Sequence, residues 1–422
     1  MTTVALFFMQ SLLVVCLPYL VWRLLKLRNW IPLVVLQILF GIVLGPAVLG
    51  GVAPKLWPLL FTRESLTALS GLAWLAVVLF AFLTGLHLQP STFKGLGRSF
   101  VVVSLSSIFT PTLLGTLAGW WIAYLHPEAV GPAATTGQFA AAIGVCIGVT
   151  ALPVLGAILR ESGLITHRVG RISLGIAAIN DATLWVLLTF ILVGLSPRGM
   201  TPLSGFWLSV VGLIYLFLMF VPVRVLLQHR IGGSEVLTES GLVMVCAAIF
   251  GSAFVAEWCG LHAVLGGFVA GAIMPRKVAQ AIIAQLEPIT VMVLLPFFFI
   301  RTGLTTHFDL FSGGLLEVFL IATVTSVLGK FWGTALPARW MGEGWPVACA
   351  LGTLMQTKGM MEVVVLTVLL EVKVVSATCF SGMLFMAIAT TILTAPALRM
   401  ICRFTSLPCP DKTAPPDSSP SL

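Results

Sequence analysis

The sequence predicts an all-α polytopic membrane protein with about 13 transmembrane helices. Of its 422 residues, 59% are hydrophobic and only 9% are charged, whereas a soluble domain carries about 25% charged residues. The mean hydropathy is +1.08. Apolar stretches long enough to cross a bilayer follow one another along almost the whole chain. Nearly all of the chain is therefore expected to lie in the lipid bilayer.

The predicted spans can be placed along the chain by hydropathy. They cover residues 3–22, 30–50, 66–87, 99–125, 136–159, 170–194, 204–227, 238–257, 260–275, 286–304, 313–336, 345–370 and 376–402. The first span has neither the basic segment nor the small-residue cleavage site of a signal peptide, so we expect it to remain as a membrane helix. Residues 404–422 are rich in Pro and Ser and are expected to form a disordered tail after the transmembrane domain, 1–403.

The distribution of charge orients the spans. Most of the 23 Lys and Arg residues lie in the loops after odd-numbered spans and in the C-terminal segment. Those on the opposite side are Lys55, Arg63, Arg198, Arg301 and Lys373. The positive-inside rule then places the N-terminus outside and the C-terminus in the cytoplasm, as in a multi-pass protein of the cell (inner) membrane. The net charge of +8 belongs to these loops and does not indicate binding of nucleic acid.

Cysteine and histidine give no sign of a cofactor or a resident metal. The eight Cys residues form no C-x-x-C pair, and most lie within apolar spans, where Cys behaves as a small hydrophobic residue. The six His residues form no H-x-x-x-H or His/Glu ligand set. We therefore expect no cofactor and no zinc site.

Asp181 is the first candidate functional residue. It lies in the apolar stretch Ser173–Leu195, which would reach roughly 34 Å as a helix and so exceeds a bilayer core of about 30 Å. A carboxylate well inside such a helix costs about 2.5–3.5 kcal/mol on insertion scales and usually marks an ion or proton path. Asn180 precedes it and shares this depth.

Two sequence motifs recur seven spans apart. Phe80–Leu86 in the third span is repeated with Phe, Thr, Gly and Leu in register at Phe298–Leu304 in the tenth. The G-x-x-x-G of Gly41–Gly45 in the second span returns as Gly267–Gly271 in the ninth. Either match alone also fits simple helix packing. Together they predict two inverted-topology six-helix repeats, since an odd offset reverses a helix in the membrane. The first repeat is 1–194, the linker helix 204–227 and the second repeat 238–403.

The fifth span of each repeat carries the signs of a broken helix. The residues Gly148, Thr150 and Pro153 cluster at the centre of the span 136–159. Pro removes an amide donor and frees a carbonyl, and the Thr hydroxyl offers another oxygen. The span 345–370 has a polar centre ending in Gly359. A merely kinked helix is the alternative for the first of these spans, because Pro and Gly are frequent in membrane helices.

Two lysines are predicted near mid-membrane, too deep to reach the interface. Lys358 has Glu362 four residues later, on the same helix face, so the two can form an ion pair. Its charge could also offset the dipoles of two half-helices that meet at the break. Lys330 has no partner in its own span, and we expect it to face Asn180 or Asp181.

These features together resemble the monovalent cation/proton antiporter superfamily, which has the sodium/hydrogen exchanger fold. The closer likeness is to the branch that holds glutathione-gated potassium efflux antiporters and plant cation/proton exchangers. The resemblance covers almost the whole chain and rests on the order and spacing of six motifs. They are F-G-I-V-L-G-P (40–46), L-F-A-F-L-T-G-L (79–86), A-I-N-D-A-T-L-W (178–185), L-G-G-F-V-A-G-A-I-M-P (265–275), L-P-F-F-F-I-R-T-G-L (295–304) and Q-T-K-G-M-M-E (356–362).

The resemblance implies roles for the candidate residues. Asp181 matches the ion-binding aspartate of that family, Asn180 the residue paired with it, and Thr150 the oxygen at the broken helix. Lys330 matches the lysine on the eleventh helix, and Lys358 the basic residue at the second break. Some relatives have two acids where this chain has Asn-Asp. The resemblance further implies a homodimer, in which the first three helices of each repeat form a scaffold and the last three a moving core.

The predicted function is exchange of a monovalent cation, Na⁺ or K⁺, for protons by alternating access. Carboxylate, amide, hydroxyl and carbonyl oxygens suit a hard cation, and Asp181 would bind either the cation or a proton. The alternative is a sodium-coupled symporter of an organic anion, which would need more polar binding residues. An intramembrane enzyme would need a second deep Asp or a Ser/His pair, so we expect no enzymatic activity.

Overall fold

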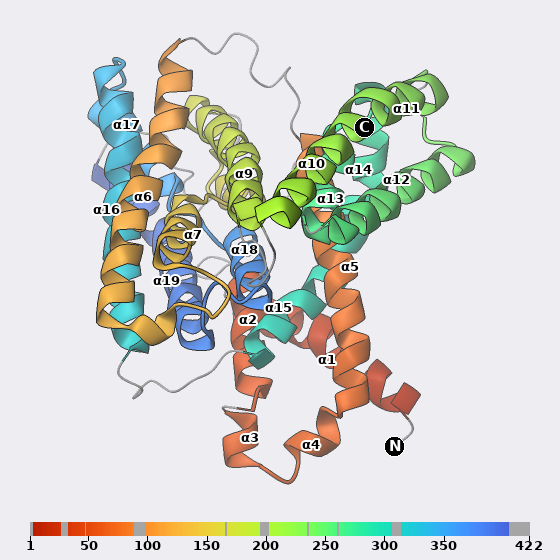
Figure 1. Cartoon of the computed structure of the whole chain (residues 1–422). Helices are drawn as coiled ribbons and strands as arrows, with labels where there is room; N and C mark the ends of the chain where they lie inside the picture. Colours follow the sequence, from red (N-terminus) through yellow and green to blue (C-terminus); the bar gives the residue numbers. More distant parts are fainter. Residues whose placement is uncertain are drawn as a thin grey trace.

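The computed structural model describes residues 3–26, 33–46, 48–87, 98–164, 167–194, 202–233, 236–259, 261–305 and 314–404. The predicted tail beyond Phe404 lies outside this part of the chain. The described residues form helices joined by short connections, with one isolated antiparallel bridge between Val130 and Val375 (Figure 1). The structure therefore agrees with the all-α class predicted from the sequence.

The helices follow one another in chain order. They are α1 (Thr3–Leu24), α2 (Leu33–Leu44), α3 (Leu49–Val52), α4 (Trp57–Leu60), α5 (Arg63–His87), α6 (Arg98–Leu125), α7 (Thr136–Gly148), α8 (Leu152–Glu161), α9 (Arg168–Gly194), α10 (Pro202–Leu218), α11 (Arg224–Ile231), α12 (Glu239–Trp258), α13 (Ala263–Ala272), α14 (Arg276–Ile289), α15 (Leu295–Thr305), α16 (Leu315–Trp340), α17 (Trp345–Leu354), α18 (Met360–Glu371) and α19 (Ala377–Phe404). Two π-helical turns, Met219–Val223 and Thr290–Leu294, join α10 to α11 and α14 to α15.

Ten helical segments in the described residues are long and apolar enough to cross a membrane. Three shorter apolar helices, α7, α13 and α17, occupy the fifth, ninth and twelfth predicted spans. The fifth and twelfth spans are each divided into two helices, α7 with α8 and α17 with α18. Helix length alone thus identifies ten spans, and the interrupted helices coincide with the positions where the sequence carries Gly, Pro and buried polar residues.

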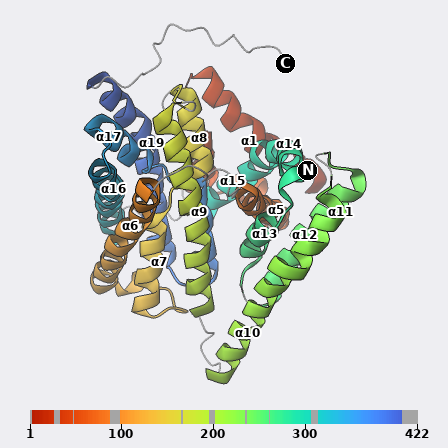
Figure 2. The same cartoon turned by 90° about the horizontal axis from the view of Figure 1, so that it is seen from above.

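The helices pack as two bundles. Helices α6 to α9 and α16 to α19 contact one another and contain both interrupted helices, and we call them the broken-helix bundle. Helices α1, α2, α5 and α10 to α15 form the second group, which we call the linker bundle. Figures 1 and 2 show the two groups side by side, with α9 at the boundary. The main contact between them is made by α9 against α5 and α13.

Glycine allows close approach of helices inside the linker bundle. A Cβ at Gly41 of α2 would lie 2.8 Å from the Ile300 Cα of α15, and one at Gly303 would lie 2.5 Å from the Ile42 amide nitrogen. The other motif pair behaves in the same way, because a Cβ at Gly85 of α5 would lie 2.8 Å from the Ala272 nitrogen of α13. The repeated glycine motifs therefore serve as helix contacts, α2 with α15 and α13 with α5.

Candidate functional site

The two helix breaks lie against each other at the centre of the broken-helix bundle. Helix α7 ends at Gly148 and α8 starts at Leu152, while α17 ends at Leu354 and α18 starts at Met360. The amide of Ala151 donates a hydrogen bond of 2.7 Å to the Thr357 carbonyl. The Thr150 hydroxyl donates a bond of 3.0 Å to the Met355 carbonyl. Each break thereby satisfies backbone groups of the other, as buried non-helical backbone in a membrane requires.

The residues at the breaks fit the local backbone. Gly359 has a φ of +62°, a conformation that costs a residue with a side chain roughly 1–3 kcal/mol. Gly148 packs closely on α6, since a Cβ there would overlap the Thr112 hydroxyl. Pro153 is the second residue of α8, where a helix has no need of that amide donor. The proline thus starts the second half-helix instead of kinking a continuous one.

Asn180 is held by two hydroxyl groups. Its side-chain oxygen accepts a hydrogen bond of 3.1 Å from Ser107 of α6, and its nitrogen donates one of 3.5 Å to Thr150. The Asn180 side chain is fully buried. These contacts fix the amide orientation and join α6, α9 and the first break.

Asp181 is also buried, at 1% exposure, but its carboxylate has no such partners. Neither oxygen accepts a hydrogen bond from any residue that the structure describes. The Lys330 ammonium acts on it electrostatically, and the backbone amide of Leu152, at the start of α8, lies nearby. A buried carboxylate without donors is costly in the charged form. Asp181 is thus the side chain in this network that remains open to a proton or a cation.

Lys330 binds the first break directly. Its Nζ donates hydrogen bonds of 2.7 Å to the Thr150 hydroxyl and 3.1 Å to the Ser107 carbonyl. We expected it to contact Asn180 or Asp181, and it reaches Asn180 only through Thr150 and Ser107. The reason is the packing of α16 on α6, which sets Lys330 beside the backbone of Ser107.

All three hydrogen-bonding sites of the Thr150 hydroxyl are occupied in this arrangement. A hydroxyl has one donor and two acceptor sites, and here Thr150 donates to Met355 and accepts from Lys330 and Asn180. For Thr150 to act as an ion ligand, Lys330 or Asn180 would have to release it.

Lys358 contacts both of the groups considered in the sequence analysis, the Glu362 carboxylate and the end of a half-helix. Its Nζ lies 3.4 Å from a Glu362 carboxylate oxygen, with both side chains fully buried. The same Nζ donates hydrogen bonds of 3.1 and 2.9 Å to the Cys146 and Ile147 carbonyls, in the last turn of α7. A cation there offsets the negative end of the α7 dipole. Lys358 and Glu362 therefore neutralise each other and stabilise the break.

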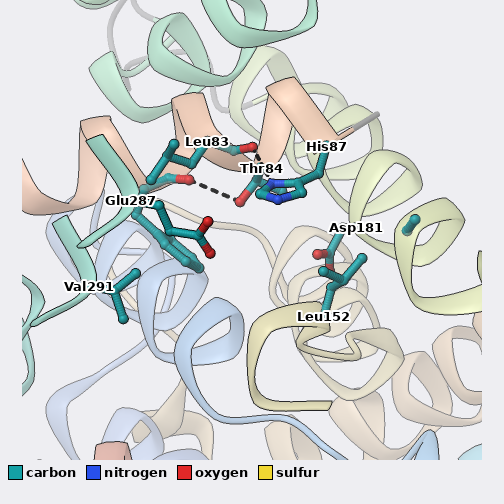
Figure 3. A pocket seen from close by; sticks show the side chains of 9 residues that line it. Leu83, Thr84, His87, Leu152, Asp181, Glu287 and Val291 are labelled. Carbon is teal, nitrogen blue, oxygen red and sulfur yellow. Dashed lines mark hydrogen bonds between the residues drawn. The ribbon is translucent and has the colours of Figure 1, made fainter. Parts of the chain in front are cut away.

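A pocket of about 30 Å³ lies beside Asp181, between the two bundles. Asp181 and Leu152 line it from the broken-helix bundle, and Thr84, His87 and Glu287 from the linker bundle (Figure 3). His87 is the last residue of α5, so this pocket leads from Asp181 towards the end of the molecule that carries the basic loops. A water needs about 10–15 Å³ of such space, so the pocket has room for about two waters.

The opposite side of Asp181 is closed. Trp185, one helical turn further along α9, stacks on Phe268 of α13 with ring centroids 5.3 Å apart. Further out, Arg301 of α15 lies 3.6 Å from the Glu371 carboxylate at the end of α18. Both contacts join the broken-helix bundle to the linker bundle. Asp181 therefore has a pocket on one side and packed side chains on the other.

Comparison with known proteins gives the family. The model of the sodium/hydrogen exchanger transmembrane family matches residues 11–403. The chain belongs to this family. The resemblance read from the sequence motifs is thereby confirmed, and the family is one of transporters.

Several relatives of this chain are named as antiporters. It is 33% identical to Cation/H(+) antiporter 17 of Arabidopsis thaliana, over 91% of this chain and 47% of that protein. It is 30% identical to the Na(+)/H(+) antiporter NhaS4 of Synechocystis, over 86% of this chain and 90% of that protein. It is 29% identical to K(+)/H(+) antiporter 1 of Saccharomyces cerevisiae, over 88% and 43%. The chain spans about half the length of the plant relatives.

A solved structure shares the exchanger fold. The sodium proton antiporter MjNhaP1 from Methanocaldococcus jannaschii matches with a TM-score of 0.59 at 12% sequence identity. The match covers 95% of this chain and 99% of that one. At this identity the likeness concerns the fold alone.

Several residues of the site were not predicted from the sequence. Ser107 holds both Asn180 and Lys330, and its only signal is the S-L-S-S run within an otherwise apolar span. Glu287 lies at the edge of a predicted span, where an acid looks like an ordinary boundary residue. Trp185 and Phe268 look like core residues in the sequence. Their place in the site depends on how the bundles pack.

Proposed function

We propose that this protein exchanges a monovalent cation, Na⁺ or K⁺, for protons across a membrane by alternating access, with Asp181 binding each in turn. The observation that carries the proposal is the state of the Asp181 carboxylate. It is buried, accepts no hydrogen bond from the described residues and lines a pocket of about 30 Å³. An ionised carboxylate in that position needs a proton or a cation to neutralise it.

Competition between the two ions follows from this geometry. A second buried acid of the broken-helix bundle, Glu362, already faces Lys358. Asn180 cannot titrate, so within the broken-helix bundle Asp181 is the pocket-lining acid that we propose takes up either ion, while Glu287 lines the pocket from the linker bundle. If one proton replaces one monovalent cation, the loaded carboxylate is neutral in both cases. We therefore propose one-for-one exchange that does not respond to membrane potential.

Alternating access is supported by the arrangement of the bundles. The pocket beside Asp181 lies on the side of the basic loops, and the Trp185–Phe268 stack closes the other side. With the orientation that the charge bias favours, the structure faces the cytoplasm. Movement of the broken-helix bundle along the linker bundle would separate Trp185 from Phe268 and expose Asp181 to the outside.

The glycine contacts favour the inverted-repeat arrangement with 13 spans. A repeat that relates the second span to the ninth and the third to the tenth turns a contact between spans 2 and 10 into one between spans 9 and 3. These are the two close pairs observed, α2 with α15 and α13 with α5. We accordingly keep 1–194 and 238–403 as the repeats, with 204–227 as linker.

The same proposal includes the setting of the protein. We place it in the cell (inner) membrane with the N-terminus outside, the C-terminus cytoplasmic and the linker bundle as the static part of a homodimer. Single cysteines introduced at loops on the two sides test the orientation, because only those outside would react with an impermeant thiol reagent in intact cells. Reaction of the basic loops from outside would contradict it.

The pocket size argues against an organic-anion symporter. Sites for small organic ligands usually occupy about 300–1,000 Å³, whereas the space at Asp181 is about 30 Å³. The lining acids Asp181 and Glu287 would also repel an anion. A dehydrated monovalent cation fits both the space and the charge.

A vesicle experiment tests the proposed function. Proteoliposomes are loaded with an acidic interior and a pH-sensitive dye, and Na⁺ or K⁺ is then added outside without any organic solute. Cation exchange predicts that the interior becomes alkaline on addition of the salt alone. A response that requires an organic solute would contradict the antiporter and support the symporter.

A further inference from the structure

A second pocket, of about 500 Å³, lies within the linker bundle and away from Asp181. Its walls come from the ends of α5 and α13, from α11 and from the first turn of α14. Figures 1 and 2 show α11, α13 and α14 close to one another. It is at the end of the molecule that carries the basic loops.

Three positive side chains line this pocket. They are Arg224 of α11 and Arg276 and Lys277 of α14. None of them forms an ion pair with another residue in the described part of the chain. Among the described residues, no acidic side chain lines the pocket, while the amide of Gln228 adds a further hydrogen-bonding group. The positive charge is therefore available to a ligand.

The start of α14 adds to the positive potential. This helix runs for 14 residues from Arg276, and its N-cap, Pro275, has no side chain that can bond the first amides. Free amides and the helix dipole favour an anion at such an end. Pro275, Arg276 and Lys277 themselves line the pocket, so the helix end and the three basic side chains converge on one cavity.

The neighbouring surface is apolar and faces outward. The segment from α10 to α11 exposes Phe217, Leu218, Phe220, Val221, Val225 and Leu226. In a membrane this face would contact acyl chains, and Arg224 lies at the same segment as part of the pocket wall. If the basic residues bind the anionic group of a larger molecule, hydrocarbon chains attached to that group would lie along α10 and α11.

We propose that this pocket binds a phosphate group, presented by an anionic phospholipid or free in solution. Three basic side chains and an uncapped helix start match the charge and the oxygen acceptors of a phosphate. The adjoining apolar face favours the phospholipid of these two sources. Bound there, the group joins α11 to α14 and stabilises the linker bundle. None of the residues involved lies in the Asp181 site, so the proposal does not depend on cation exchange.

The test uses the full chain in a mild neutral detergent. One arm adds phosphatidylglycerol, with phosphatidylcholine as the neutral comparison, and records the melting temperature and the lipid retained in native mass spectra. The other arm adds inorganic phosphate, with chloride at equal ionic strength. The variant is Arg276→Gln/Lys277→Gln. Its matched control is Arg23→Gln/Arg403→Gln, which removes the same charge from exposed helix ends outside the pocket.

The expected result is a higher melting temperature and retained lipid with phosphatidylglycerol for the wild type and the control. The pocket variant should bind roughly thirtyfold more weakly, since each basic residue removed weakens anionic lipid binding about fivefold. A rise with inorganic phosphate as well would identify free phosphate as a second source. If the double variant is not folded, Arg224→Gln alone serves, with about a fivefold loss expected. No shift in either arm, or equal losses in variant and control, would overturn the proposal.

Discussion

Lys330 Nζ donates a hydrogen bond of 2.7 Å to the hydroxyl of Thr150, a residue of the first helix break. The same hydroxyl donates to the carbonyl of Met355 in the second break. One threonine therefore links a buried cation, α16 and both interrupted helices. Its contribution is structural in this state, and the carboxylate of Asp181 is left open to the pocket.

Replacing Thr150 with valine should destabilise the protein. Thr150→Val keeps the shape of the side chain but leaves the Met355 carbonyl unpaired and removes one partner of Lys330. The expected loss is about 1–3 kcal/mol of unfolding free energy, measured by thermal unfolding in detergent. Thr323→Val is the control, because among the described residues the Thr323 hydroxyl donates only to the Phe319 carbonyl within its own helix. Equal stability of the two variants would show that the link between the breaks is unimportant.

Gly359 should not tolerate a side chain. Gly359→Ala places a Cβ at a φ of +62° and 2.9 Å from the Val154 side chain. We expect a loss of about 1–3 kcal/mol, visible as a lower melting temperature. In α5, a Cβ added at Gly71 would have no other atom within 4 Å, so Gly71→Ala should be neutral or slightly stabilising. A Gly359→Ala protein as stable as the Gly71→Ala control would contradict the strained backbone at the second break.

The ion pair between Arg301 and Glu371 should favour the state with a closed outer side. Arg301→Gln removes this link between the bundles, and a partly exposed ion pair contributes up to about 1 kcal/mol. The outward-open population should then rise up to about fivefold.

The readout is reaction of a single cysteine, Thr189→Cys, with an impermeant thiol reagent in a background without other cysteines. Thr189 lies in the packed layer next to Trp185 and His262. Labelling from outside should be faster in the Arg301→Gln background and unchanged by Lys55→Gln, which alters an exposed loop cation. Unchanged labelling in both would mean that the pair does not hold the outer side closed.

The contact between α6 and α16 should strengthen as pH falls. Burial lowers the pKa of His126, but hydrogen bonds to Glu317 and Glu128 outweigh it, so the pKa lies above its usual value of 6.5. A pKa raised by folding adds stability that is complete below about pH 6.5 and is lost as pH rises through the folded-state pKa.

His126→Gln should therefore reduce the melting temperature more at pH 6 than at pH 8, with a free-energy difference of about 0.2–1 kcal/mol because both glutamates are exposed. His229→Gln, at an exposed position of α11, is the matched control. An effect of His126→Gln that is the same at both pH values would refute this interpretation.

The burial of Asp181 and the places of the helix breaks could be predicted from the sequence. A single acid in a long apolar run is costly in a membrane and therefore indicates a functional site. Gly148, Pro153 and Gly359 interrupt apolar spans where a helix would otherwise continue. The pairing of Lys358 with Glu362 follows from their spacing of four residues. Such features depend on local sequence, so they can be read before the fold is known.

The partners supplied by other helices could not be predicted. The position of Lys330 against Ser107 depends on the register between α16 and α6, and that register is set by packing. Glu287 and Asp181 share a pocket although they come from different bundles. The stack of Trp185 on Phe268 likewise needs the relative position of α9 and α13.

The most direct test of the proposed mechanism compares cation-dependent proton efflux from proteoliposomes containing wild type, Asp181→Asn and Asp181→Glu at equal amounts of folded protein. Asp181→Asn keeps the size of the side chain but can bind neither proton nor cation as a charged ligand, whereas Asp181→Glu retains a carboxylate. We predict that Asp181→Asn lowers exchange to the level of empty vesicles with an unchanged melting profile, while Asp181→Glu keeps measurable exchange. Exchange by Asp181→Asn near the wild-type rate would contradict the central role of this carboxylate.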